Sequence, residues 1–272
     1  MTTETLTAPL LDKTKYGPWA VVAGASEGTG AEFAREIARS GINLLLIARR
    51  QGPLDALAEE LRRDHGVEAR TLSVDLNAED AARRIIEAAS DIEVGFYVAN
   101  AGAGQGGTTF LDTPMQTVRD LIARNILVTI AACQHFGRAM QARGRGGIVL
   151  MGSGAGLGGQ PGVAVYSGVK GFVLNLAESL WSELRGAGID VIGIAAPVMD
   201  TPMLRATHGA IEFPGMFAAG DVVRNTLRRL TDGPCYVYSL EGTEAESERQ
   251  TKVRRDRVLA VEAFSKSFFK GD

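Results

Sequence analysis

The chain has 272 residues, of which 45% are hydrophobic and 22% are charged, and its formal net charge is −3 at pH 7. This balance is typical of a folded globular protein and excludes a disordered chain, and the slight negative charge argues against nucleic acid as a partner. The length fits one α/β domain with a tail.

No apolar run reaches the roughly 18 residues that a membrane span needs, and residues 1–15 lack the apolar core of a signal peptide. We therefore predict no membrane span and a cytoplasmic location. Cys133 and Cys235 are far apart and lack the spacing of metal ligands. We expect them to be free thiols in a reducing compartment, and we expect no metal site.

In chain order, residues 1–17 form a polar lead-in, and the apolar run at 19–23 predicts a strand buried on both faces. A glycine-rich turn follows at 24–30, and residues 31–40 have helical spacing that ends at Gly41. The same unit then repeats along the chain. Further strands are predicted at 42–48, 69–74, 94–98, 147–151, 189–194 and 236–238. Further helices are predicted at 54–63, 79–89, 165–185 and 221–230, with one or two helices over 113–140.

Strands that alternate with helices predict parallel βαβ units joined by right-handed crossovers. We therefore predict the α/β class, with a single Rossmann-type, doubly wound parallel sheet of about seven strands and helices on both faces, over residues 18–240. Residues 201–220 lack a clear period, and we expect them to be functional. Their apolar residues include Met203, Leu204, Ile211, Phe213, Met216 and Phe217. Residues 241–272 form a charged tail with an amphipathic stretch at 253–269.

The glycine turn is the first chemical signal. It reads Gly24-Ala-Ser26-Glu-Gly28-Thr29-Gly30, follows the first predicted strand and opens a helix. Glycine allows a tight turn and a close backbone approach to a pyrophosphate, and the helix N-terminus offers free N–H groups. An ordinary strand-to-helix turn is the alternative, but the position at the start of a βαβ series favours nucleotide binding.

The end of the second strand indicates which nucleotide binds. An acid there suits the ribose of NAD, whereas an arginine suits the 2′-phosphate of NADP. This chain has Arg49 and Arg50 and no acid nearby, so Arg49 is a candidate phosphate clamp. A solvated arginine pair is the alternative, and Glu27 would oppose a phosphate. We predict NADP(H) as the preferred cofactor, with NAD(H) possible.

Four residues form the catalytic hypothesis. Tyr166 and Lys170 share a helix face, and an ammonium near a phenol lowers the pKa of that phenol. Ser153 follows the fifth strand, at the sheet edge where ligands of such folds bind, and its hydroxyl is suited to bond an oxyanion. Asn125 is a polar residue in an apolar helix, either as a structural amide or as one that holds a water in a proton path.

Together these motifs resemble the short-chain dehydrogenase/reductase family over residues 18–238. The glycine motif matches at Gly24, Gly28 and Gly30, the acid after the third strand at Asp75, and the Asn-Ala-Gly motif at Asn100 to Gly102. The family tetrad of Asn, Ser, Tyr and Lys matches Asn125, Ser153, Tyr166 and Lys170.

The resemblance implies that Tyr166 is the general acid/base and that Lys170 lowers its pKa and binds the nicotinamide ribose. Ser153 then orients the carbonyl and Asn125 supports a water relay. The implied cofactor contacts are Gly24, Ser26, Gly28, Thr29, Gly30, Arg49, Arg50, Asp75, Leu76, Asn100, Ala101, Gly102, Tyr166, Lys170, Pro197 and Thr201. The departures from the family pattern are Ala23, Thr29, Ala99 and the run Ala196-Pro197-Val198, and they affect local cofactor geometry.

The segments at 16–22 and 44–49 resemble the hydroxysteroid dehydrogenase and long-chain 3-oxoacyl reductase branch. This implies an oxidoreductase that interconverts a ketone and a secondary alcohol on a small hydrophobic substrate, as the apolar segment at 201–220 would suit. It also implies a homodimer or homotetramer. Two alternatives are an NADP-binding redox sensor or scaffold without turnover, and a partner-binding role for the tail. A reductase of double bonds or sugars is the alternative within the enzyme class.

Overall fold

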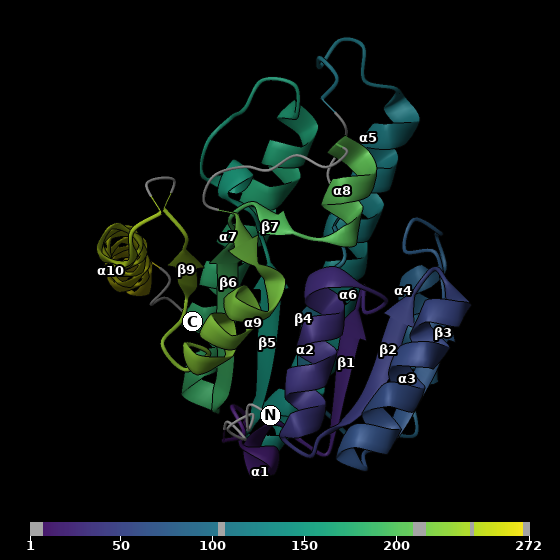
Figure 1. Cartoon of the computed structure of the whole chain (residues 1–272). Helices are drawn as coiled ribbons and strands as arrows, with labels where there is room; N and C mark the ends of the chain where they lie inside the picture. The colour runs from purple at the N-terminus through teal and green to yellow at the C-terminus, as the bar shows by residue number, and fades with distance from the viewer. Residues whose placement is uncertain (1–7, 103–106, 209–215, 240–241, 269–272) are drawn as a thin grey trace.

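The computed structural model describes residues 8–102, 107–208, 216–239 and 242–268. Its centre is a seven-stranded, fully parallel sheet with the order β3-β2-β1-β4-β5-β6-β9 (Figure 1). The strands are β1 Trp19–Ala23, β2 Asn43–Ala48, β3 Ala69–Ser73, β4 Val94–Ala99, β5 Gly146–Met151, β6 Ile189–Ala195 and β9 Cys235–Val237. The order reverses between β1 and β4, which is the switch point of a doubly wound sheet. The predicted fold class is confirmed.

Helices cover both faces of this sheet, α2, α3 and α9 on one and α4, α6 and α7 on the other. The helices are α1 Lys13–Tyr16, α2 Gly28–Arg39, α3 Gln51–His65, α4 Ala81–Ala88, α5 Met115–Ile122, α6 Val128–Arg143, α7 Ala164–Leu184, α8 Pro202–His208, α9 Ala219–Arg228 and α10 Glu244–Phe268. A short pair of strands, β7 Met199–Asp200 and β8 Phe217–Ala218, flanks α8. The seven strands of the sheet lie within a few residues of the predicted ones. The last part of the glycine turn, Gly28–Gly30, forms the start of α2, whereas α1, α8, β7 and β8 were not predicted.

Alternate residues of each strand serve opposite faces. In β1, Val22 belongs to the core under α2, α3 and α9, whereas Val21 belongs to the core under α4, α6 and α7. Because both faces are covered, the strands are continuous apolar runs rather than alternating ones, as parallel sheets require. Each fully buried aliphatic side chain in these cores contributes about 1.5–3 kcal/mol by leaving water.

The residues just before β1 pack against the amino ends of the strands. Leu11 and Tyr16 are buried, and the Tyr16 hydroxyl donates to Asp190 Oδ2 at 2.5 Å. Burial of this phenol, together with its bond to the carboxylate, raises its pKa. The last part of the predicted polar lead-in is therefore attached to the sheet, at the end opposite to the carboxyl ends of the strands (Figure 1).

The predicted charged tail is a 25-residue helix, α10, which packs beside the edge strand β9 and against α7 (Figure 1). Arg254 donates to Glu178 on α7 at 2.6 Å, and Thr251 accepts from the backbone of Val237 at 2.9 Å. The helix thus covers an edge that would otherwise expose backbone groups. Phe269, the last residue of the predicted amphipathic stretch, lies outside the described residues.

Candidate active site

The glycine turn is held against β4 by Asn100. The Asn100 side chain donates to the Gly24 carbonyl at 2.9 Å and accepts from the Thr29 hydroxyl at 2.7 Å. Gly24 has a φ of 85°, and a Cβ at Gly30 would overlap the Gly24 carbonyl oxygen. Glycine is needed here because the turn must be tight and the helix start must approach its backbone. Two segments about seventy residues apart therefore form one surface at the switch point.

The other predicted cofactor residues line the same sheet edge. Gly28 lies beside Thr201, whose buried hydroxyl accepts from the Leu204 backbone at 3.2 Å and so begins α8. Ser26 and Pro197 are partly buried, and Leu76 is buried in the core. Asp75 accepts from the Asn77 backbone at 3.0 Å in the turn after β3.

The arginine pair after β2 divides into two environments. Both side chains are exposed, but Arg50 forms an ion pair with Glu27 at 2.6 Å. Glu27 was expected to oppose a phosphate here. Because Arg50 neutralises that carboxylate, the charge that remains next to the turn is that of Arg49.

Asn125 is positioned by a widened turn of helix. Residues Ala123–Leu127 are π-helical, between α5 and α6, so the predicted helix at 113–140 is one continuous element with a local defect. The Asn125 side chain donates to the Leu121 carbonyl at 2.9 Å. Its Oδ1 is buried and has no hydrogen-bond partner within the described part of the chain. Such π turns are frequent at functional sites, and a buried orphan acceptor indicates a missing donor.

Ser153, Tyr166 and Lys170 converge at the carboxyl end of β5. Ser153 begins a 3₁₀ turn, Gly154–Leu157, its hydroxyl accepts from the Ala155 backbone at 3.2 Å, and it lies near enough to Tyr166 to lower the pKa of that phenol. Lys170 is buried, its Nζ donates to the Met151 carbonyl at 2.8 Å, and it lies 5.7 Å from the centre of the Tyr166 ring. The structure therefore brings these three side chains together.

Gly102 connects this cluster to Asn125. A Cβ on Gly102 would overlap both Asn125 Oδ1 and Lys170 Nζ, so both atoms lie against its backbone. Since Asn100 contacts the glycine turn and Gly102 contacts the tetrad, one short segment joins the two predicted sites. Both predicted sites therefore lie side by side along the carboxyl ends of the strands.

The electrostatics correct one expectation. Lys170 was predicted to lower the pKa of Tyr166, but the pKa of this phenol is raised by burial, against the opposing effects of Ser153 and the Arg124 charge. Burial lowers the pKa of Lys170 to about 7, with Arg124 acting in the same direction. A buried ammonium is costly, so burial favours the neutral form of the lysine.

Arg124 was not among the site residues predicted from the sequence. Its side chain is partly buried, and Nη1 donates to Asn77 Oδ1 at 3.2 Å. The charge of this arginine interacts with Asp75 and Arg49 and also with Tyr166. The available signal was an arginine directly before Asn125 in an otherwise apolar stretch of helix.

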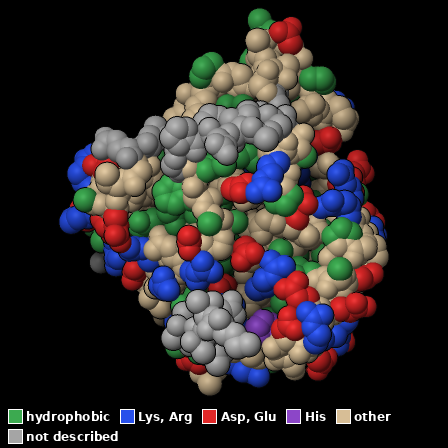
Figure 2. All heavy atoms as spheres, in the orientation of Figure 1, with side chains coloured by type: hydrophobic (Ala, Val, Ile, Leu, Met, Phe, Trp, Pro, Cys, Tyr) green, Lys and Arg blue, Asp and Glu red, His purple; other side chains and the backbone are tan. Residues whose placement is uncertain are grey.

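Exposed apolar side chains lie in the segments that follow β5 and β6. Leu157, Val198 and Met203 are 38%, 51% and 40% exposed, although their side chains are large and apolar. Figure 2 shows hydrophobic side chains grouped left of the centre of one face, with charged side chains of both signs around and below them. A hollow of about 520 Å³ lies between the loop after Ser153 and the first turns of α7. Ile211 and Phe213, predicted to be functional, lie outside the described residues.

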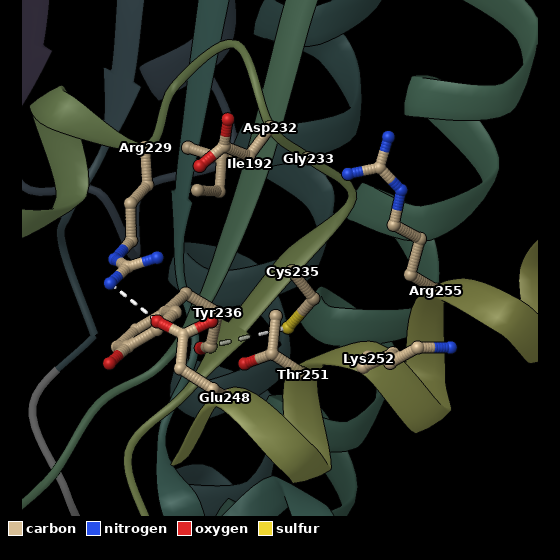
Figure 3. Close-up of a pocket in the computed structure, with 10 residues that line it drawn as sticks. All are labelled: Ile192, Arg229, Asp232, Gly233, Cys235, Tyr236, Glu248, Thr251, Lys252 and Arg255. Carbon is tan, nitrogen blue, oxygen red and sulfur yellow. Dashed lines mark hydrogen bonds and ion pairs between the residues drawn. The ribbon is translucent and has the colours of Figure 1, made fainter. Parts of the chain in front are cut away.

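A cavity of about 190 Å³ lies elsewhere, between β9, the preceding loop and α10 (Figure 3). Arg229 points to Glu248 and pairs with it at 2.5 Å, and the Cys235 thiol faces the Tyr236 carbonyl. Burial raises the pKa of this thiol to about 12. None of the predicted site residues, all of which the structure describes, lines this cavity. It is separate from the candidate active site.

Clusters of metal ligands and membrane-spanning helices are both absent from the described part of the chain. Among the described residues, no group of three or more His, Cys, Asp or Glu side chains is placed to hold a metal ion. Within the same part of the chain, no helix has the length and apolar character required to cross a membrane. Cys133 and Cys235 are both buried and free.

The chain is similar to known dehydrogenases and reductases. It is 37% identical over 206 residues to the very-long-chain 3-oxoacyl-CoA reductase of Podospora anserina. The match covers 74% of this chain and 60% of that protein. It is 31% identical to the 7β-hydroxysteroid dehydrogenase of Collinsella aerofaciens, over 70% of this chain and 72% of that protein. The chain therefore spans less than two thirds of the fungal relative.

A solved structure extends the likeness to three dimensions. The short-chain dehydrogenase of Sphingobium yanoikuyae, in complex with NADPH, superposes with a TM-score of 0.78 at 27% identity, covering 88% of this chain and 94% of that chain. The family model for short chain dehydrogenases matches residues 18–210. The glycine turn, the sheet order and the grouped tetrad lie within or beside that matched region. This chain belongs to the short-chain dehydrogenase family.

Proposed function

We propose that this protein is an NADP-dependent oxidoreductase that interconverts a ketone and a secondary alcohol on a hydrophobic substrate of the steroid or 3-oxoacyl type. The observation that carries this proposal is the convergence of Ser153, Tyr166 and Lys170 close to the glycine turn, at the carboxyl ends of the strands and near the switch point of the sheet. The names of the relatives and the exposed apolar side chains that follow β5 and β6 support the substrate class.

The residues present fit a nicotinamide dinucleotide. The helix start at Gly28–Gly30 offers backbone N–H groups to a pyrophosphate, and Arg49 offers a charge to a 2′-phosphate. At the other end, the orphan acceptor of Asn125 and the ammonium of Lys170 provide polar groups for the nicotinamide ribose and an ordered water. When bound, the nicotinamide ring supplies or accepts the hydride.

The protein's own groups handle the proton. In the reductive direction the Tyr166 hydroxyl donates its proton to the carbonyl oxygen as the carbonyl carbon receives the hydride, which yields the alcohol. The Ser153 hydroxyl donates a hydrogen bond to the same oxygen and stabilises the charge that develops there. Lys170 and Asn125 then return a proton to Tyr166 through water. In the oxidative direction each transfer is reversed.

The first test is a titration of the purified protein with NADPH and NADH, followed by oxidation of bound NADPH with a panel of ketosteroids and 3-oxoacyl thioesters. Tight NADPH binding and turnover of one ketone are expected. Binding without turnover across the panel would favour the redox sensor. No binding of either cofactor would refute the proposal.

Arg49→Ala is expected to weaken NADPH binding about 10- to 100-fold, which is the range of one hydrogen bond to a charged group. NADH, which lacks the 2′-phosphate, should bind within about twofold of the wild-type affinity. The measurement is cofactor titration by fluorescence at two salt concentrations. Arg138→Ala, at an exposed arginine on α6, is the matched control. Arg50→Ala should also weaken NADPH binding, because it leaves the Glu27 carboxylate unpaired. An equal loss for both cofactors would refute the clamp.

The cytoplasmic location and the homodimer or homotetramer remain predictions. Leu127 is 59% exposed at the junction of the π turn and α6, which supports an interface on this helix. Light scattering of the purified chain measures the subunit number directly.

A further inference from the structure

We propose that Arg124 is a cofactor-binding residue. From the π turn Ala123–Leu127, its side chain holds the adenosine half of the nicotinamide cofactor. This inference rests on the proposed function, and it adds a contact that no motif assigns. It concerns a residue on the same π turn as Asn125, so it ties cofactor recognition to the element that positions the tetrad.

The Arg124 side chain reaches from the π turn to the turn after β3. Its backbone is in Ala123–Leu127, which packs against α7 next to the tetrad. Its guanidinium instead reaches the turn after β3, where Nη1 donates to Asn77 Oδ1 at 3.2 Å. The Asn77 backbone in turn donates to Asp75 at 3.0 Å. Arg124 therefore extends from the catalytic helix to the strand end that the resemblance assigns to adenine.

Several charged groups lie around Arg124. Asp120 on α5 has the strongest charge interaction with it, and Asp75 and Arg49, at the ends of β3 and β2, also lie within its electrostatic reach. Tyr166, near the end of β5, interacts with it as well. A dinucleotide bound along the carboxyl ends of these strands would extend from Asp75 and Arg49 to Tyr166. The adenosine half must then pass the guanidinium of Arg124.

The guanidinium of Arg124 has the chemistry to bind an adenosine phosphate. A guanidinium is planar and stays charged, and it binds both the face of an aromatic ring and the oxygens of a phosphate. The Nε atom of Arg124 is buried, so its charge is less screened by solvent than that of the exposed Arg49. The adenosine half of NADP offers both an aromatic ring and phosphates, whereas the nicotinamide half lies beside Tyr166 and Lys170.

The test uses Arg124→Met, which keeps most of the length and removes the charge, with Arg138→Met, an exposed arginine on α6, as the matched control. Calorimetry measures the affinity of each protein for NADPH and for adenosine 2′,5′-bisphosphate, the adenosine fragment alone. We expect Arg124→Met to lose about 10- to 100-fold in affinity for both ligands, as for one charged hydrogen bond, and Arg138→Met to lose nothing. Arg124→Lys, which keeps the charge, should lie between.

Kinetics separate binding from a general structural effect. For Arg124→Met the KM for NADPH should rise by about the factor lost in affinity, while kcat at saturating NADPH falls by less. An unchanged affinity for the bisphosphate, or a fall in kcat without a fall in affinity, would overturn the inference. Failure of the wild type to bind NADPH and NADH would instead overturn the proposed function, so the two failures are distinguishable.

Discussion

Tyr166→Phe is expected to lower kcat for ketone reduction by about 10²- to 10⁴-fold, the usual contribution of a positioned general acid. The substitution removes only the hydroxyl that donates the proton and leaves the ring against Lys170. NADPH affinity should therefore stay within a few-fold of the wild type. Stopped-flow oxidation of NADPH with a ketone found in the first screen measures the rate, and fluorescence titration measures the affinity.

Tyr97→Phe is the matched control for this variant. The Tyr97 hydroxyl is buried in the core and has no hydrogen-bond partner among the described residues. Its removal should leave kcat unchanged and the stability equal or higher, because an unsatisfied buried hydroxyl is costly. Full activity in Tyr166→Phe would refute the assignment of the general acid.

The pH dependence of the wild type follows from the raised pKa of Tyr166. Reduction needs the protonated phenol, which persists well above neutral pH when burial raises its pKa. Oxidation of the alcohol needs the phenolate, so its rate should increase with pH through the alkaline range. Initial rates in both directions across this range measure the effect. An oxidation rate that reaches its plateau below neutral pH would contradict it.

Lys170→Met is expected to abolish most activity and yet to stabilise the folded protein at neutral pH. The pKa of Lys170 is lowered by burial to about 7, whereas an unfolded lysine titrates near 10.4. Between these pH values the unfolded chain binds more protons than the folded chain. The destabilisation caused by burying Lys170 is therefore absent above about pH 10.4, grows as the pH falls to about 7, and is constant below about pH 7. Methionine removes this penalty but loses the bond to the Met151 carbonyl. The net gain should be about 1–3 kcal/mol at pH 7.

Urea unfolding of both proteins, without cofactor, at several pH values between 7 and 10 measures this gain. The advantage of Lys170→Met should shrink as the pH rises, because the wild-type lysine then loses its proton in both states. A variant less stable than the wild type by the same amount at every pH would show that the packing of Lys170 outweighs its charge. The activity loss, expected to be at least about 10²-fold, is followed with the same ketone.

The difference between Arg49 and Arg50 shows the limit of sequence reasoning about the cofactor. Two adjacent arginines at a strand end are equivalent in the sequence. Only the folded chain brings Glu27 to 2.6 Å from Arg50 and so distinguishes them. The glycine turn that carries Glu27 and the second strand are separate segments, and their contact depends on how α2 packs on the sheet.

In the tetrad, too, some features could be predicted from the sequence and others depended on the folded structure. The spacing of Tyr166 and Lys170 and the place of Ser153 after β5 could be predicted, because helix period and strand direction are local properties. The direction of the Tyr166 pKa was not, since it depends on how much protein surrounds the hydroxyl. Arg124 was missed for a similar reason, because its guanidinium meets the β3 turn only in three dimensions.

The amino-acid sequence by itself determined the parallel α/β class, the order of the elements, the glycine turn and the residues that match the family tetrad. These follow from the hydrophobic period and from motifs whose spacing survives in a linear chain. The tertiary structure alone decided the π turn that positions Asn125, the pairing of Glu27, the reach of Arg124 and the packing of α10 on β9. Each of these depends on burial or on contact between distant segments, and both arise only when the strand ends and helices come together.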